Sequence, residues 1–522
     1  MVSGRTPEAL RAQADRLADH LETTDIPVTD LAHATATTRA AFTHRAAVVG
    51  SELAEVVTGL RAVAAGDPAL QGEARVAPPV AFLFSGQGAQ RVHMGRELYL
   101  AHPVFAAAFD EVLALLDPEV HAALGDEDRI DRTEFAQPAL FAFEVALVRL
   151  LESWGVHPDF VTGHSVGEIA AAHVAGVLSL SDACALVSAR ARLMGALPSG
   201  GVMVAVRASE ADVLPFVGEG VDVAAVNSRG SVVLSGHEEA VVAVAAKFAK
   251  HRRLRVSHAF HSVLMEPMLA EFGDVVAKLD FAEPRVPVVS AGDVTSPAYW
   301  VSQIRDTVRF GDAIERLTEA GVTVFAELGP DATLTAVVDE PAAHVIPVQR
   351  KDRDEATAAA EALARLHVAG VAVDWAARFP KARRVTLPTY AFQHEWFWPL
   401  PAAGGDATGL GLAPAGHPLL GATLALADSP GVVFSGRLSA ATQPWLRDHV
   451  VGGTILFPGA AFLELAVRAA DEVGCAAVED LTLAVPLVLD PDGAVVLQLA
   501  VGEPGEGGRR ALTISSRTDD DW

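Results

Sequence analysis

The stretch Gly163-His164-Ser165-Val166-Gly167-Glu168 follows an apolar run and precedes an alanine-rich segment, 169–174, that has the composition of a helix. A serine between two glycines at a strand-to-helix turn is the pattern of a nucleophile elbow, because small neighbours permit the sharp turn that presents the hydroxyl. The amides that open the next helix favour negative charge developing there. The chain contains 43 glycines, so this pattern also arises by chance, and the rest of the sequence must decide what Ser165 does.

The composition describes a multidomain protein with enough apolar material for packed cores. The chain has 522 residues, 51% of them hydrophobic, and a formal net charge of −26. This acidity argues against a nucleic-acid partner, which would need a basic face. The start of the chain lacks a charged-then-apolar signal and no apolar run reaches roughly 18 residues, so we expect a cytoplasmic protein without a membrane partner. The cysteines, Cys184 and Cys475, lack metal-ligand spacing, which predicts buried free thiols and no metal site.

Changes in the pattern divide the chain into five segments: 1–75, 76–350, 351–400, 401–416 and 417–522. The first carries helix signals but no chemistry, and the second alternates strands and helices as α/β domains do. The third is a helix followed by an aromatic arm at 387–398, which must pack against something. A flexible linker follows, and then alternating strands around one apolar helix predict an incomplete hot-dog.

Residues 201–257 change to the order βαββαβ, which predicts a small ferredoxin-like subdomain inserted into a larger hydrolase-like α/β subdomain. Asn227 is placed in the turn between its two middle strands. The strands expected here are 203–206, 221–226, 231–235 and 254–256, and the helices are 210–217 and 238–250. In the larger subdomain we expect strands at 80–84, 286–290, 322–327 and 344–348, a helix at 137–147 opened by Pro138, and a helix at 184–194 capped by 181–183.

Ser165 needs a base, and a histidine suits it because imidazole accepts the hydroxyl proton near neutral pH and returns it to the leaving group. His261 is a candidate, but His164, His173 and His258 compete with it. No glycine-rich His-Gly-Gly loop and no acidic residue stands out as in an ordinary serine hydrolase.

Two further groups carry polar side chains that acyl-transfer chemistry can use. Glycines flank Gln87 in the loop after the first buried strand, so the backbone can approach a ligand closely and the amide can help form an oxyanion hole; alternatively Gln87 is an ordinary loop residue. Arg190 and Arg192 lie on a mainly apolar segment, where an arginine can also simply extend its charged end into water.

Four motifs in the right order resemble the acyltransferase domain of modular type I polyketide synthases, a family related to the malonyl-CoA:acyl-carrier-protein transacylases of fatty-acid synthesis. They are 84–90, 163–168, 188–194 and 258–261. The resemblance covers residues 1–400, so that 1–75 would be the linker after a ketosynthase and 351–400 the linker behind the acyltransferase.

The resemblance implies a role for each matching residue. Ser165 would be the nucleophile and His261 the general base, oriented by a backbone carbonyl to make a dyad. Gln87 and the Val166 amide would form the oxyanion hole. Arg190 would bind the malonyl carboxylate bidentately, which a lysine cannot copy. No metal or redox cofactor is implied, and malonyl-CoA is the substrate.

The resemblance also concerns the choice of substrate. In this family His-Ala-Phe-His, found here at 258–261, resembles the malonyl-selective class, whereas Tyr-Ala-Ser-His marks methylmalonyl. A bulky Phe260 would disfavour a methyl branch by about 1–3 kcal/mol. Val166 and the stretch 132–137 point the same way. His258 either shapes the pocket or is a loop residue, and we also count Asn227 among the candidate substrate-binding residues.

Residues 417–522 resemble the first half of a polyketide-synthase dehydratase domain, a double hot-dog. His449 with Gly453 and Pro458 matches the family's histidine motif, and that histidine would remove an α-proton. The family's aspartate acid has no counterpart in the chain, so we expect no dehydratase activity. Without the resemblance, His449 would be an ordinary loop residue.

Malonyl transfer to the phosphopantetheine thiol of an acyl carrier protein is therefore the expected function, with the ketosynthase and the rest of the dehydratase as further partners. The carrier is usually acidic in this family, and 252–255 or 381–384 would offer it a basic patch, unless both are solvated charge runs. Two alternatives stay open: a serine esterase or thioesterase that is indifferent to Arg190, and a non-catalytic scaffold fragment of the synthase.

Overall fold

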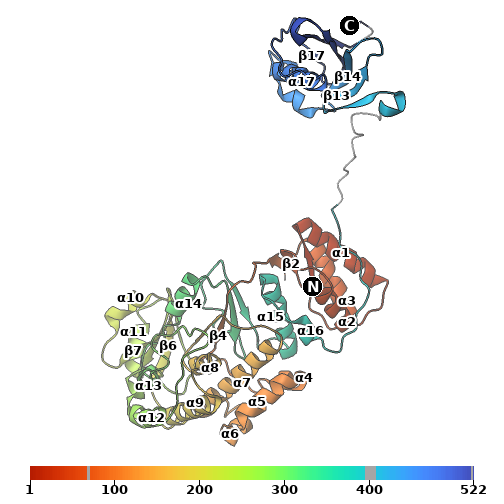
Figure 1. The fold of residues 1–522 in the computed structure, drawn as a ribbon. Helices are drawn as coiled ribbons and strands as arrows, with labels where there is room; N and C mark the ends of the chain where they lie inside the picture. Colours follow the sequence, from red (N-terminus) through yellow and green to blue (C-terminus); the bar gives the residue numbers. More distant parts are fainter. Residues whose placement is uncertain (68–70, 394–406, 519–520) are drawn as a thin grey trace. The chain divides into compact units, whose positions relative to one another are not determined.

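Four parallel strands form the sheet that carries the elbow. The computed structural model describes residues 1–67, 71–393, 407–518 and 521–522 (Figure 1). The sheet has the order β11-β10-β4-β5 and consists of β4 (Val80–Phe84), β5 (Phe160–Gly163), β10 (Val324–Leu328) and β11 (His344–Pro347). Every residue of β4 and β10 is buried, as expected for central strands of a parallel sheet covered on both faces. The predicted strand at 286–290 is wrong: only Val288 forms a bridge, parallel to Val161 of β5.

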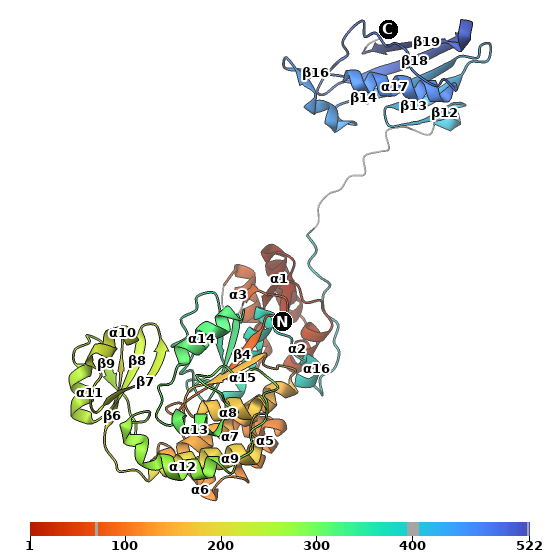
Figure 2. The ribbon, with the colours of Figure 1, turned by 60° about the vertical axis from the view of Figure 1, so that its left-hand side comes forward.

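Helices surround this sheet and bury its apolar residues in two cores, a large one and a smaller one in which Ala81, Leu83 and Phe325 pack against α14 (Phe310–Glu319) (Figure 2). The helices are α4 (Arg96–Ala101), α5 (Pro103–Leu113), α6 (Pro118–Ala123), α7 (Thr133–Ser153), α8 (Gly167–Val174), α9 (Leu180–Gly195), α12 (Leu269–Val276), α13 (Pro297–Gln303) and α14, with the 3-10 turn η2 (Val263–Met268) before α12.

Two predicted helix starts are wrong. Helix α7 begins at Thr133 because the carbonyl of Arg132 already accepts from two amides, so Pro138 lies inside the helix instead of opening it. Helix α9 begins at Leu180, where the Ser179 hydroxyl accepts from the Asp182 amide and caps the helix.

The inserted subdomain has the predicted ferredoxin-like order, an antiparallel sheet β7-β8-β6-β9 with two helices. Its elements are β6 (Val202–Val206), α10 (Glu210–Val213), η1 (Leu214–Phe216), β7 (Val221–Ser228), β8 (Ser231–Gly236), α11 (Glu238–Ala245) and β9 (His251–Arg253). The last strand comes earlier than predicted, because after Leu254 bonds to Met203 the chain leaves the sheet. Asn227 lies within β7 and not in the turn, since β7 stays paired as far as Ser228.

The first residues form a separate small body with its own core. A sheet of β1 (Val2–Gly4), β2 (His44–Ala46) and β3 (Gln71–Glu73) packs with α1 (Pro7–Glu22), α2 (Val28–Thr37) and α3 (Leu53–Ala65). Leu387, from the aromatic arm, is part of this core. Tyr390 accepts from the Arg5 amide and its ring lies 5.1 Å from that of Phe42. The prediction that the arm packs is therefore confirmed for Leu387 and Tyr390, whereas Phe392 is exposed and 394–398 lie outside the described residues.

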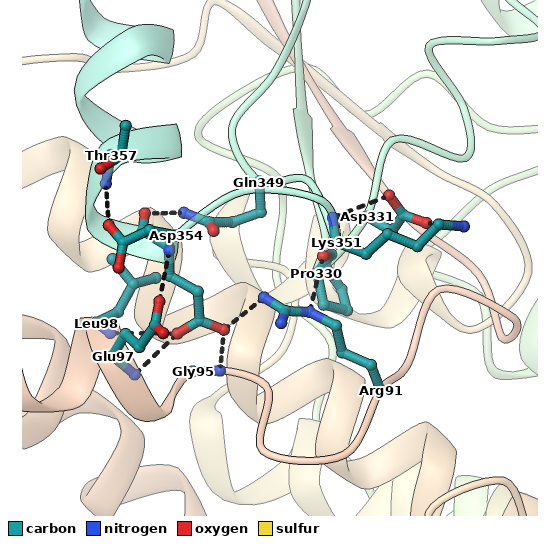
Figure 3. A network of polar contacts seen from close by, with 11 residues as sticks. Arg91, Gly95, Glu97, Leu98, Pro330, Asp331, Gln349, Lys351, Asp354 and Thr357 are labelled. Atoms are coloured by element: carbon teal, nitrogen blue, oxygen red, sulfur yellow. Dashed lines mark hydrogen bonds and ion pairs between the residues drawn. The ribbon is translucent and has the colours of Figure 1, made fainter. Parts of the chain in front are cut away.

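Two helices behind the sheet, α15 (Glu355–Ala369) and α16 (Trp375–Arg378), belong to the large core. The buried Glu355 carboxylate accepts from the Gly95, Glu97 and Leu98 amides and pairs with Arg91 at 2.6 Å (Figure 3). In return, the Glu97 carboxylate accepts from the Glu355 amide at 2.7 Å. The N-termini of α4 and α15 thus cap each other.

The chain divides into two compact units, Met1–Gln393 and His394–Trp522. The second has an antiparallel sheet of order β12-β13-β14-β18-β19, against which α17 (Gly459–Glu472) packs its apolar side. The strands are β12 (Ala413–His417), β13 (Leu420–Ala425), β14 (Val432–Ser439), β18 (Ala494–Pro504) and β19 (Arg510–Arg517); a smaller sheet holds β15 (Val450–Val451), β16 (Thr454–Leu456) and β17 (Val488–Leu489), and the 3-10 turns are η3 (Ala407–Leu410), η4 (Pro444–Asp448) and η5 (Glu506–Gly508).

The predicted linker at 401–416 extends too far, because β12 already begins at Ala413 and pairs with β13. Residues 401–406 of that linker lie outside the described residues. No helix in the described part of the chain is long and apolar enough to cross a membrane. Within the same residues, no group of three or more His, Cys, Asp or Glu could hold a metal ion. Cys184 is buried, whereas Cys475 is only partly so.

Candidate active site

Ser165 occupies a strained turn between β5 and α8. Its φ is +54°, a left-handed conformation that costs energy for any residue with a side chain. Both flanking glycines are required by space: a Cβ at Gly163 would lie 2.2 Å from the Gly167 carbonyl carbon, and one at Gly167 would lie 2.4 Å from the Phe84 oxygen. The elbow pattern in the sequence therefore corresponds to a real elbow.

Among the four candidate histidines, the structure brings His261 to the serine. Its Nε2 lies 2.7 Å from Ser165 Oγ, and its Nδ1 donates to the backbone carbonyl of Asp306 at 2.9 Å. That carbonyl fixes the proton on Nδ1 and leaves Nε2 free to accept one. His173 lies elsewhere, with Nδ1 on the Leu178 carbonyl.

His261 is buried, with 3% of its surface exposed, and its pKa is lowered to about 3. Burial is the main cause, because it disfavours the charged imidazolium, and the neighbouring Arg190 and His164 add to it. The ring is therefore neutral at physiological pH, which is the protonation state that a general base requires.

Arg190 and Arg192 have different environments. Arg190 is 3% exposed, and its Nη2 donates to Ser165 Oγ at 3.0 Å. Its Nη1 donates to Gln137 Oε1, while Nε has no partner among the described residues. Burial lowers its pKa to about 10, and the charge of Glu168 acts in the opposite direction, so Arg190 stays charged at neutral pH. Within the described residues, no carboxylate comes close enough to form an ion pair with it. Arg192 is exposed and pairs with Glu271 at 3.1 Å.

Gln87 and Val166, the residues predicted to form the oxyanion hole, have different surroundings. Val166 is the N-cap of α8, and its amide donates to no acceptor within the described chain. Amides at this position of a helix are free to bind a negative charge. The Gln87 side chain accepts from the Thr133 hydroxyl at 2.9 Å, and Thr133 in turn connects through Gln137 to Arg190.

The remaining candidates in this unit are Asn227, His258 and Phe260, and the hydrogen bonds of their side chains in the described chain are to residues other than Ser165 and His261. His258 bonds to the Leu197 carbonyl through Nε2 at 3.1 Å, and Phe260 is buried in the large core. Asn227 accepts from His164 Nε2 at 2.9 Å, so it supports the residue that precedes the serine. Their contact with a substrate stays a prediction.

Sequence reasoning missed Gln303 and Asp306. Gln303 donates to the Ser165 carbonyl at 2.9 Å and to Glu168 at 3.0 Å, and Tyr299 donates to the same carboxylate at 2.6 Å. The end of α13 and the residues after it thus support both the serine and the histidine. Nothing in the sequence marked Gln303, because its contact is to a backbone atom 138 positions away.

The basic patches and the second unit complete the predicted sites. Arg252 and Arg253 lie exposed on the edge strand β9, where Arg253 pairs with Glu238. At the other patch, 381–384, Arg383 Nε lies 3.6 Å from Asp30 Oδ2. In the second unit, His449 is exposed and its Nδ1 lies 2.9 Å from the Leu456 carbonyl.

An elbow serine bonded to a buried neutral imidazole defines a serine nucleophile site in an α/β fold. Comparison with protein-family models is consistent with such a site. Residues 81–373 match the acyl transferase domain, 417–517 the polyketide synthase dehydratase domain, and 1–60 the CurL-like polyketide synthase C-terminal family.

Curated relatives and solved structures extend this match. The chain is 49% identical over 556 residues to the phenolphthiocerol synthesis polyketide synthase type I Pks15/1 of Mycobacterium marinum and 48% identical over 570 residues to the polyketide synthase GfsA of Streptomyces halstedii. Both alignments include 100% of this chain but only 26% and 8% of the relatives' lengths.

Among solved structures, the acyltransferase domain from the second module of the salinomycin polyketide synthase shares 51% identity at a TM-score of 0.64, covering 75% of this chain and 99% of that one. FabD from Acinetobacter baumannii shares 29% identity at a TM-score of 0.52, covering 56% and 99%. The chain belongs to the acyltransferase family of modular type I polyketide synthases. Its acyltransferase domain is followed by the start of a dehydratase domain.

Proposed function

We propose that the first unit transfers a malonyl group from malonyl-CoA to the phosphopantetheine thiol of an acyl carrier protein. The observation that carries this proposal is Arg190, a buried cation at hydrogen-bond distance from the nucleophile. The charge of Glu168 acts on it, but within the described residues no carboxylate forms an ion pair with it. A buried charge that is left unpaired is costly, so a substrate that brings its own carboxylate gains the most from this site.

The transfer takes two half-reactions with one dyad. His261 Nε2 accepts the Ser165 proton while Oγ attacks the thioester carbonyl, and the Val166 amide with Gln87 stabilises the oxyanion that forms. The intermediate collapses to the malonyl-serine ester, and His261 returns the proton to the departing thiolate of coenzyme A. The carrier's thiol then repeats these steps in reverse order, with His261 accepting the thiol proton and Ser165 leaving.

Selection of malonyl over methylmalonyl rests on Phe260. Its ring is 8% exposed and lies 6.1 Å from that of His258, directly before the base His261 in the chain. A rigid ring beside the acyl α-carbon would leave little room for a branch, and one methyl group is worth about 1–3 kcal/mol of discrimination.

The test is intact-protein mass spectrometry after mixing the chain with equal malonyl-CoA and methylmalonyl-CoA. We expect a malonyl adduct on Ser165 in excess over the methylmalonyl adduct, and none on the Ser165→Ala variant. An esterase would instead leave no stable adduct and hydrolyse neutral esters, and a scaffold would show neither reaction. Transfer to an added acyl carrier protein, followed in the same way, tests the second half-reaction.

For the second unit we propose no dehydration by the unit alone. His449 is the base that the family resemblance assigns, but it is exposed, and within the described residues no carboxylate is hydrogen-bonded or ion-paired to it. Incubating the chain with a β-hydroxyacyl thioester and looking for loss of water by mass spectrometry checks this expectation.

A further inference from the structure

Both residues of the dyad have left-handed backbones. The φ of Ser165 is +54° and that of His261 is +55°. A residue with a side chain keeps this conformation only where its surroundings hold it. At Ser165 the flanking glycines, Gly163 and Gly167, make room for the turn, but His261 has no glycine beside it. The bonds around His261 must therefore hold its conformation.

The inserted subdomain supplies one of these bonds. Asp222 lies on β7, and its Oδ2 accepts from the amide of Val263 at 2.8 Å, two positions after His261. This amide is the first of the 3-10 turn η2, so the turn itself offers it no acceptor. A carboxylate on a backbone amide makes a strong hydrogen bond. Asp222 thus fixes the segment that carries the base, from a position 41 residues away.

The same strand also holds the segment whose carbonyl accepts from the base. The Thr307 hydroxyl donates to the Val223 carbonyl at 2.7 Å, and the Val308 amide donates to the next carbonyl along β7 at 2.9 Å. Thr307 and Val308 directly follow Asp306, whose carbonyl fixes the Nδ1 proton of the imidazole. Strand β7 therefore bonds to the chain on both sides of the histidine ring.

Arg305 adds a charge between these two segments. Its Nε lies 3.0 Å from a carboxylate oxygen of Glu266 in η2, and its Nη2 lies 3.8 Å from Asp222 Oδ1. Since the Asp222 side chain is 32% exposed, water screens the longer pair and makes it weak. The bond from Asp222 to the Val263 amide is the stronger of its two contacts.

We propose that Asp222 and Thr307 are positioning residues for His261, through which the inserted subdomain sets the direction of the base toward Ser165. This inference rests on the proposed function, because it requires the dyad to be the reactive pair. His261 Nε2 lies 2.7 Å from Ser165 Oγ, and a small displacement of the ring lengthens this contact and slows proton transfer.

A small neutral serine reagent tests this positioning without the binding of malonyl-CoA. With phenylmethanesulfonyl fluoride, Ser165 Oγ bonds to sulfur, fluoride leaves, and His261 accepts the hydroxyl proton. In Asp222→Ala we expect the rate constants of sulfonylation and of malonyl loading to fall together by about tenfold, while the fraction of chains finally labelled stays unchanged. Asp222→Asn keeps an oxygen for the Val263 amide, so its rate constants should stay within about threefold of those of the unaltered chain.

Asp212 gives a matched control in the same subdomain. Its carboxylate accepts from the Ser209 hydroxyl at 2.6 Å and from the Ser209 amide at 3.3 Å, at the start of its own helix α10. Asp212→Ala thus removes a bond of the same kind, and both rate constants should stay within about twofold. Intact-protein mass spectrometry over time gives the rate constant and the final labelled fraction, and thermal midpoints show which variants are folded.

The rate constant and the labelled fraction separate positioning from folding, because partial unfolding lowers the fraction and poor positioning lowers the rate constant. A folded Asp222→Ala with unchanged rate constants, an equal loss in Asp212→Ala, or an Asp222→Asn as slow as Asp222→Ala would overturn the proposal. If Asp222→Ala does not fold, Thr307→Val decides in the same assay, and an unchanged rate constant there overturns it. An unaltered chain that is sulfonylated but not malonylated would contradict the proposed function, and the sulfonylation rates would still decide this inference.

Discussion

Two histidines of this chain share the same backbone contact but differ in what their other ring nitrogen can do. His261 and His449 each place Nδ1 2.9 Å from a backbone carbonyl, of Asp306 and Leu456 respectively. His261 is buried and its Nε2 meets the hydroxyl of Ser165, whereas His449 is exposed and no bond of its Nε2 occurs in the described chain. A carbonyl on one nitrogen fixes the tautomer, but the other nitrogen and the burial decide whether a histidine can act as a base.

The largest expected effect is on the rate of Ser165 acylation, and it should distinguish the two histidines. His261→Ala should lower the rate of Ser165 acylation by roughly 10³-fold or more, because no other base reaches Oγ. His449→Ala should leave that rate unchanged. Stopped-flow release of free coenzyme A measures both. Equal losses in the two variants would contradict the assignment of His261.

Arg190 and Arg192 extend the comparison to a buried and an exposed cation on one helix. Arg190→Met should reduce malonyl loading by roughly 10²-fold, since the substrate carboxylate loses its charged partner. Arg192→Met, which removes only a surface pair with Glu271, should stay within about twofold. Adduct formation over a range of malonyl-CoA concentrations gives both numbers. If Arg190→Met kept full loading, that result would favour the alternative in which the protein is a serine esterase or thioesterase.

Burial also predicts how the site responds to acid. The His261 pKa of about 3 keeps the ring neutral well below the ordinary value of 6.5, so loading should persist at pH 5 and fall only as pH approaches 3. Between 6.5 and 3 the unfolded chain binds a proton at this residue that the native chain does not, so the stability of the native fold falls as pH decreases through this window. Loading rates between pH 8 and 3, and unfolding midpoints over the same range, check both signs. His261→Phe should remove this residue's share of the pH dependence of stability.

Selectivity should respond to smaller changes in the same region. Phe260→Ser should raise the ratio of methylmalonyl to malonyl loading by about tenfold, because the added space admits one methyl group. Competition between the two thioesters, read by mass spectrometry, gives the ratio directly. If the ratio equals that of the unaltered chain, Phe260 does not determine the selectivity for malonyl.

The smallest effect concerns the exposed charges. Reversing Arg252 and Arg253 to glutamate should weaken transfer to an acidic carrier protein a few-fold at low salt, and less at high salt, because surface charges are screened. Acylation of Ser165 itself should not change. Reversing Arg383 and Arg384 tests the alternative patch in the same assay. Equal transfer by the Arg252 and Arg253 variant excludes that patch as the docking site.

The fold and the site differed in how far the sequence could predict them. Strand β4 was predicted correctly because a continuous apolar run marks a buried strand. The elbow was predicted correctly because its closely spaced glycines and serine reflect local steric requirements. Boundaries failed where a single contact decides them, as at Ser179, which caps α9, and at Val288, which forms one bridge instead of a strand.

The site divides in the same way. Ser165, Arg190 and His261 stand in motifs of the family resemblance. Without the resemblance, spacing alone left His261 with three rivals, and only the packing of distant segments brings its ring to Ser165. Gln303 gave no signal, because a glutamine that supports a backbone carbonyl leaves no spacing or composition to detect. Such supporting residues are visible only once the chain has folded.

The mutual capping of α4 and α15 has a consequence for anyone who wishes to exchange acyltransferases between synthases. A splice made directly after the last strand of the sheet would remove Glu355 and leave three amides and Arg91 without their carboxylate. A splice before the aromatic arm would strip Leu387 from the core of the first body. The transplantable part therefore runs to Gln393, where the first unit ends and a join would break no described contact of either core.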